Sequence, residues 1–146
     1  MIIRWNGHSC FTLETAQGTV VLDPYAPGSV PGLPELKLKA DAVLCSHGHA
    51  DHNYAQGVAL SGRPCAVSVE TLPCFHDSVQ GAKRGPDLIH ILSAEGMRIA
   101  HLGDLGHGLD LEQLETQLKN GAKAMILCNP HNPVSRLWRK EELTAL

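Results

Sequence analysis

Short alternating, β-branched or apolar segments in the first two thirds of the chain predict β-strands. We expect residues 1–23 to form two strands joined by a turn at Gln17 and Gly18. Residues 11–15 alternate and residues 19–22 are rich in β-branched side chains, which supports both strands. The other strands expected are residues 41–45, 64–69, 88–92 and 97–102, of which the last two form a hairpin around Glu95 and Gly96.

A helical spacing of apolar residues is confined to short segments. The helices expected from it are residues 54–60, 109–118 and 140–146, and a buried strand at residues 124–128 lies between the last two. The chain holds no internal repeat and no linker long enough to separate two domains. We therefore expect a single domain over residues 1–146.

A chain of 146 residues with 43% hydrophobic and 18% charged residues is ordinary for a globular protein and can bury a core. The net charge of −3 and the lack of a basic run argue against a nucleic-acid partner. No apolar stretch approaches the roughly 18 residues of a membrane span, and residues 1–14 lack the apolar run of a signal peptide. We therefore expect a cytoplasmic protein without a membrane partner. Most of its five cysteines are expected to be small buried side chains and not parts of a disulfide framework.

Histidine is the unusual residue type, with nine in the chain and a dense group after the strand expected at residues 41–45. His47, His49, Asp51 and His52 lie within six residues of one another. Imidazole and carboxylate groups suit Zn²⁺, and also Fe or Mn. Any one of these histidines taken alone is more typical of a hydrogen-bonded loop residue, but the whole group favours a metal site.

The sequence Ser-His-Gly-His-Ala-Asp-His at residues 46–52 resembles the HxHxDH signature of the metallo-β-lactamase superfamily. Other motifs occur in the order that this family shows, and they resemble its small branch related to the ascorbate-phosphate lactonases. These motifs are Gly7-His8-Ser9, Leu22-Asp23-Pro24, Cys74-Phe75-His76-Asp77, Arg84-Gly85 and residues 101–107. The resemblance covers residues 1–108.

The resemblance implies an α/β fold, a truncated αβ/βα sandwich with metal ions at one edge of its two sheets. The ligands that it implies are His47, His49 and His76 for a first ion, Asp51 and His52 for a second, and Asp104 as a bridge between both. Two zinc ions are expected, with Mn or Fe as alternatives, and Asp51 and Asp104 are expected to be catalytic as well. Two neighbouring cations activate a shared water, so we expect hydrolysis of an ester, lactone or phosphoester in a small-molecule substrate. Asp23 resembles the acid that orients a ligand imidazole in this family.

Several of these residues have a plain structural alternative. His76 is also compatible with a surface position, and Asp104 with capping of the turn that follows it. His8 and His107 are compatible with contact to substrate or with exposure to solvent. We also expect Asp77 to make a hydrogen bond next to the metal ligands. His90 and His101 are expected to have structural roles.

Residues 109–146 resemble a different family, the pyridoxal-phosphate aminotransferases and cystathionine β-lyases. Asn132 matches the cofactor-contacting Asn of an Asn-Pro-x-Gly motif, but Ser135 replaces the Gly. Pyridoxal phosphate is not expected, because these 38 residues lack a recognisable Schiff-base lysine and phosphate cradle. The chain thus resembles a chimera, in which residues 109–146 patch a truncated sandwich and a homodimer covers an exposed sheet edge.

His131 follows a buried strand, as the last metal histidine does in the hydrolase family. It is either a replacement ligand or a polar turn residue, and the sequence leaves both open. The function expected is a metal-dependent hydrolase domain whose activity is weak or lost. The alternative is a catalytically inactive, metal-binding chimeric scaffold.

Overall fold

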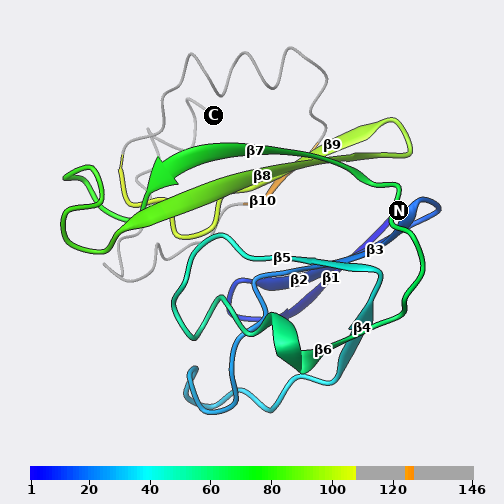
Figure 1. Ribbon diagram of the computed structural model, residues 1–146, viewed down its shortest axis with the longest axis horizontal. Coiled ribbons are helices and arrows are strands. Elements are labelled where there is room, and N and C mark those ends of the chain that lie inside the picture. Colours follow the sequence, from blue (N-terminus) through cyan, green and yellow to red (C-terminus); the bar gives the residue numbers. More distant parts are fainter. Residues whose placement is uncertain (108–123, 127–146) are drawn as a thin grey trace.

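The computed structural model describes residues 1–107 and 124–126, which form two main β-sheets (Figure 1). The first sheet has the strand order β1-β2-β3-β5. Its strands are β1 (Ile2–Gly7), β2 (Cys10–Thr15), β3 (Gly18–Leu22) and β5 (Ala42–Leu44). The second sheet has the order β10-β9-β8-β7, and its strands are β7 (Ser68–Phe75), β8 (Pro86–Ala94), β9 (Met97–His101) and β10 (Ala124–Ile126). A separate pair joins β4 (Leu38–Ala40) to β6 (Val58–Leu60).

The two sheets pack face to face, and their facing side chains form a hydrophobic core (Figure 1). Leu13, Val20 and Leu22 point inward from the first sheet, and Leu92 and Ile99 meet them from the second. Each of these side chains is at most 1% exposed. Burying a side chain of this size contributes about 1.5–3 kcal/mol, so this layer holds the sheets together.

Residues 1–23 form three strands, so the expectation of two was wrong. The additional strand is β1, which pairs antiparallel with β2. It lies at the edge of its sheet, and Ile2, Ile3 and Trp5 are all exposed. A strand that exposes apolar residues on both faces has no alternating pattern, so periodicity could not reveal it.

The helix expected at residues 54–60 was also wrong. That segment is a single turn of 3-10 helix, η1 (Ala55–Gly57), followed directly by β6. An isolated helix of about seven residues cannot offset its nucleation cost. Pairing of β6 with β4 supplies the backbone hydrogen bonds instead.

The hairpin expected around Glu95 and Gly96 is confirmed. β8 and β9 pair antiparallel up to Ala94 and Met97. Glu95 and Gly96 have positive φ angles of 52° and 71°. Two left-handed residues in a two-residue loop are typical of the type I′ turn, whose twist matches that of the flanking strands.

The strand expected at residues 64–69 was placed too early, because residues 64–67 are not in a strand and β7 begins at Ser68 and continues to Phe75. Pro73 lies within it, and β7 is the last strand of the second sheet in the described part of the chain. An edge strand tolerates proline because one of its sides needs no backbone donor. The strand expected at residues 124–128 appears as β10, which pairs in parallel with β9.

Helices contribute little to the part of the chain that the structure describes, where η1 is the one helical element. The sheets of the expected α/β fold are therefore confirmed, whereas its α-helices are not found among the described residues. The helices expected at residues 109–118 and 140–146 lie outside the described residues. Within the described ranges, no helix has the length and apolar character needed to cross a lipid bilayer.

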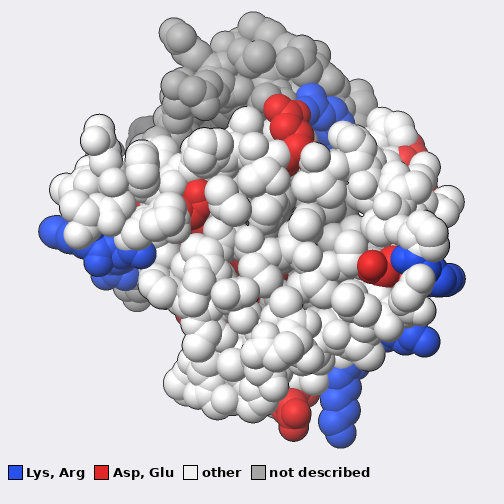
Figure 2. Space-filling model, viewed as in Figure 1, with Lys and Arg blue, Asp and Glu red and all other residues white. Residues whose placement is uncertain are grey.

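Charged side chains lie in small separate groups on the face shown in Figure 2. Several charged residues of the chain are paired, among them Arg63 with Asp41 at 3.1 Å and Arg98 with Glu70 at 3.0 Å. An exposed ion pair such as Arg98 with Glu70 contributes about 0–1 kcal/mol. The sandwich therefore depends on its apolar layer and not on its surface charges.

Candidate metal centre

Two parallel strands bring the histidine-rich loop to one edge of the first sheet. β3 ends just before Asp23 and β5 ends shortly before Ser46. The Asp23 backbone N–H donates to Leu44 O at 2.9 Å. The Asp23 carboxylate accepts hydrogen bonds from the Ser46 backbone N–H at 2.6 Å and from the Ser46 hydroxyl at 2.7 Å. The loop of residues 46–52 therefore starts from a buried, hydrogen-bonded anchor.

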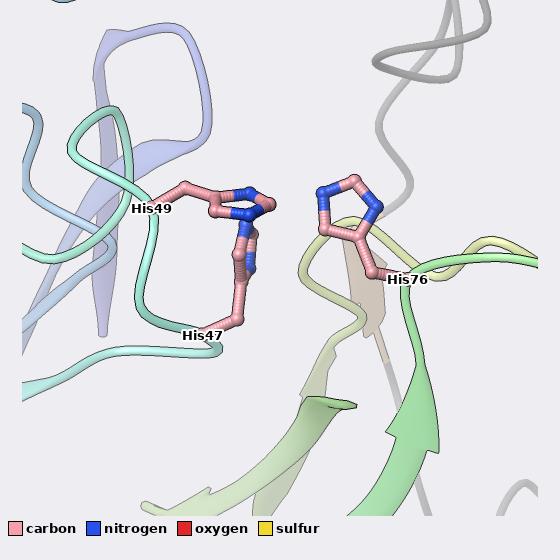
Figure 3. A group of neighbouring side chains, drawn as sticks. All are labelled: His47, His49 and His76. Carbon is pink, nitrogen blue, oxygen red and sulfur yellow. The ribbon is translucent and has the colours of Figure 1, made fainter. Parts of the chain in front are cut away.

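Three imidazole rings form the first group of metal-ligating side chains. His47 and His49 come from the loop after β5, and His76 approaches them from the end of β7 (Figure 3). The ring centroids are 4.7 Å apart for His47 and His49, 4.6 Å for His47 and His76, and 5.0 Å for His49 and His76. One donor atom of each residue lies within 4.8 Å of the others. This spacing suits three nitrogen ligands on one cation.

Two further groups adjoin the first. His47, His52 and Asp104 form one, and His8, Asp51 and His52 form the other, each with donor atoms within 4.8 Å of one another. Because His47 and His52 each belong to two groups, the donors surround neighbouring positions and not a single centre. The structure thus brings all the expected ligands together. His8 lies with them, whereas the sequence was compatible either with contact between His8 and substrate or with exposure to solvent.

Asp104 links the groups through its two carboxylate oxygens. Oδ1 lies 3.4 Å from His52 Nε2, and Oδ2 lies 3.2 Å from His76 Nε2. The turn that carries Asp104 packs against His76, because the Gly106 N–H donates to Phe75 O at 2.9 Å. A Cβ atom on Gly106 would lie 2.2 Å from the backbone carbonyl carbon of His76. The absence of a side chain at Gly106 therefore allows Asp104 to approach the histidines.

Buried carboxylates support the ligand side chains from behind. Asp23 Oδ2 accepts hydrogen bonds from His52 Nδ1 at 2.9 Å and from His101 Nε2 at 2.8 Å, and Asp87 Oδ1 lies 3.2 Å from His47 Nδ1. A carboxylate in this position fixes the tautomer of the ring and leaves its other nitrogen free to bind a metal. The sequence motifs indicated Asp23 but not Asp87 or the role of His101. Both of these lie within strands, where periodicity does not distinguish one inward residue from another.

The histidines and carboxylates of the site shift one another's pKa values. Burial lowers the pKa of His52, but the neighbouring carboxylates, Asp104 first, raise it more, to about 10. Burial raises the pKa of Asp104, but the neighbouring His52 and His76 outweigh this and hold the pKa below its ordinary value. The pKa of His49 is lowered by burial and by the neighbouring histidines. Metal ions bind the neutral imidazole and the ionised carboxylate, so a cation at His52 has to displace a proton from the ring.

Three buried atoms of the cluster have no hydrogen-bond partner among the described residues. They are His47 Nε2, His76 Nδ1 and Asp104 Oδ1. Buried polar atoms of folded proteins are nearly always paired. Nitrogen and carboxylate donors at this density are ligands of zinc and similar divalent ions, and such ions would satisfy these atoms. The residues present therefore fit a metal centre.

Other residues singled out in the sequence take structural positions. Asp77 accepts hydrogen bonds from four backbone N–H groups of residues 79–84 at 2.8–2.9 Å. It therefore stabilises that loop, whereas we expected a hydrogen bond next to the metal ligands. His90 is buried and hydrogen-bonded within the core, in agreement with its expected structural role. The His107 ring lies beside Phe75, with centroids 6.2 Å apart. His131 lies outside the described residues.

Comparisons with known proteins identify related chains. A model of the family described as "Beta-lactamase superfamily domain" matches residues 2–132. A UPF0173 metal-dependent hydrolase of Archaeoglobus fulgidus is 28% identical over 151 residues, which cover 77% of this chain and 64% of that protein. Another, from Methanoculleus marisnigri, is 43% identical over 71 residues, which cover 47% of this chain and 27% of that protein.

Solved structures are similar as well. A protein of Thermotoga maritima, described as a candidate Zn-dependent hydrolase of the metallo-β-lactamase superfamily, is 32% identical with a TM-score of 0.54. The match covers 78% of this chain and 55% of that one. A metal-dependent hydrolase candidate from Parabacteroides distasonis, 21% identical with a TM-score of 0.51, shares the fold. This chain spans less than two thirds of the length of these relatives.

The family match extends beyond residue 108, where we expected the resemblance to give way to an aminotransferase-like segment. It continues to residue 132, and β10 adds to the second sheet within that stretch. The aminotransferase resemblance and the chimera stay predictions. Because the family model matches most of its length, the chain belongs to the metallo-β-lactamase superfamily.

Proposed function

We propose that this chain forms a metal-dependent hydrolase domain that binds two divalent cations and cleaves an ester, lactone or phosphoester in a small molecule. The observation that carries this proposal is the cluster of three overlapping donor groups, in which His47 and His52 are each shared. Overlapping groups are what two cations about 3.5–4 Å apart require. The relatives described as metal-dependent hydrolases support the same activity.

The donors divide between two positions. The proposed ligands are His47, His49 and His76 at the first position and Asp51 and His52 at the second. Asp104 reaches both, because its two oxygens face His52 and His76 separately. Zinc is the ion that we propose, since it favours nitrogen and carboxylate ligands, and manganese and iron are the alternatives.

The bound cations would supply Lewis acidity, which lowers the pKa of a water molecule and stabilises negative charge on the oxygen of the substrate. The chain orients the groups around that chemistry. Asp23 holds the His52 ring through Nδ1, so that Nε2 faces the cluster. The Asp51 side chain is 29% exposed and that of Asp104 only 2%. Asp51 therefore lies where a small substrate has access, and its carboxylate is placed to accept the proton that the water loses. Asp51 and Asp104 are the residues that we propose as catalytic.

Elemental analysis and a substrate panel test this proposal. After purification with metal present, we expect about two equivalents of zinc or manganese per chain. We also expect hydrolysis of activated esters, lactones or phosphoesters. His49→Ala and Asp104→Ala should abolish this hydrolysis, whereas His90→Asn, which lies outside the donor groups, should retain it. Less than about half an equivalent of metal in the unsubstituted chain would contradict the proposal.

The alternative is a catalytically inactive, metal-binding scaffold. Chelation should lower the melting temperature in either case, because bound metal contributes to the free energy of folding. Only the hydrolase should turn over a substrate in a manner that Asp104→Ala abolishes. The cytoplasmic location and the homodimer stay predictions, which cell fractionation and size-exclusion chromatography test.

A further inference from the structure

We propose that His8 is a ligand of the second cation, beside Asp51 and His52. This inference rests on the proposed metal-dependent function, but it concerns a residue outside the ligand set that the sequence motifs indicate. His8 lies in the short connection between β1 and β2, remote in sequence from the loop of residues 46–52. Its side chain is largely buried, with 14% exposed.

The distances around His8 match those between ligands that share one ion. His8 Nε2 lies 3.2 Å from Asp51 Oδ2 and 3.1 Å from His52 Nε2. His52 Nε2 lies 3.8 Å from Asp51 Oδ2 and 3.4 Å from Asp104 Oδ1. Four donors in a tetrahedron with bonds of about 2.0–2.2 Å lie about 3.3–3.6 Å from one another. The separations among His8, Asp51 and His52 bracket that range, so these three residues can share a single cation.

The backbone is bent in a way that aims His8 at this position. The register of β1 and β2 shifts between Trp5 and Gly7, and His8 has a left-handed φ of 52°. A residue other than glycine adopts this conformation only where the surrounding structure holds it. The Trp5 indole N–H holds this turn by donating to His8 O at 2.8 Å. Bulges that redirect a side chain are common beside functional sites, so the turn itself favours a role for the ring.

A hydrogen bond alone explains the arrangement less well than a cation does. His52 Nδ1 faces the Asp23 carboxylate, which can only accept, so Nδ1 donates to Asp23 and the ring directs Nε2 toward His8. His8 Nε2 therefore faces His52 Nε2 and the Asp51 carboxylate at the same time. One N–H group on His8 Nε2 can be directed at only one of these two atoms. A divalent cation satisfies all three donors together.

The test is metal binding by the His8→Asn chain. Asn tolerates left-handed backbone, so the substitution removes the imidazole without straining the turn. Zn²⁺ binding is measured by equilibrium dialysis with elemental analysis, and Co²⁺ binding by its visible absorption. The unsubstituted chain should bind two ions. The variant should keep the first and bind the second at least about 100-fold more weakly, beyond the 10–100-fold loss typical of residues that only position a ligand.

A matched control removes a histidine outside the donor groups. His90→Asn should bind both ions as the unsubstituted chain does. If His8→Asn fails to fold, His8→Gly replaces it, because glycine is free of strain at a positive φ. Unchanged affinity for the second ion, or loss of both ions together, would overturn the His8 proposal and leave the metal-dependent function standing. Failure of the unsubstituted chain to bind metal would instead overturn the proposed function.

Discussion

Replacing Asp23 by Asn should weaken both folding and metal binding, because Asp23 holds the ring of His52 and the start of the metal-binding loop. Asp23 is fully buried and accepts four hydrogen bonds at 2.6–2.9 Å, two from Ser46 and one each from His52 and His101. Burial raises its pKa, but the hydrogen bonds from His101 and His52 outweigh this and hold the pKa well below the ordinary value. Its φ of 44° is a conformation that Asn adopts readily, so the substitution changes charge and leaves the backbone unstrained.

The expected magnitude follows from these four hydrogen bonds. Asn keeps one oxygen and presents an NH₂ group in place of the other, so at least one donor then faces another donor. Hydrogen bonds to charged groups contribute about 1.5–3 kcal/mol each, and breaking a buried charged pair costs about 3–5 kcal/mol. We therefore expect the free energy of unfolding to fall by about 3–5 kcal/mol and the melting temperature by about 6–20 °C for a chain of this length. Metal affinity should fall by about 10–100-fold, because His52 loses its fixed orientation.

Urea denaturation and thermal melting of the metal-free chain measure the loss of stability, and competition with a chromophoric chelator measures metal affinity. Asp41→Asn is the matched control. Asp41 also accepts several hydrogen bonds, including one from the Thr19 N–H at 2.8 Å, but it is in none of the donor groups. The control should change stability and leave metal affinity intact. An Asp23→Asn chain that melts within about 2 °C of the unsubstituted chain and binds zinc equally well would refute the reasoning.

Three more predictions concern the site and the fold around it. Gly106→Ala should weaken binding of the first zinc ion, because the new Cβ would lie 2.2 Å from backbone atoms of both His76 and Asp77. An unchanged zinc titration would show that the turn moves without displacing His76. Chelation of metal present at about 100 times its Kd should lower the melting temperature by about 5–11 °C, and a melting curve insensitive to chelator would contradict a bound ion in the folded state. The pKa of Asp41 is lowered from 3.8, chiefly by the Ser61 hydroxyl, so its contribution to stability is present above pH 3.8 and is lost as the pH falls below that value. The stability curves of the unsubstituted chain and Asp41→Asn should therefore converge in acid, and a constant difference down to low pH would contradict this assignment.

Local patterns predicted local structure well and failed where pairing partners decide the outcome. The turn at Glu95 and Gly96 was predictable because both its conformation and its register arise from adjacent residues. The segment at residues 54–60 was not, because β6 exists only through its pairing with β4, which is distant in sequence. β1 escaped detection for a related reason, since an edge strand exposes both faces and shows no period.

The sequence by itself determined the donor-rich loop, because His47, His49, Asp51 and His52 are so close along the chain that any compact turn brings them together. Packing of the two sheets decided the rest of the cluster. His76 and Asp104 reach the loop from the second sheet, while His8 reaches it through a bulge in the first. Asp87 meets His47 only because the strand that carries it lies against the loop. Contacts between residues far apart in sequence depend on how the sheets stack and twist, and no spacing along a single chain encodes that geometry.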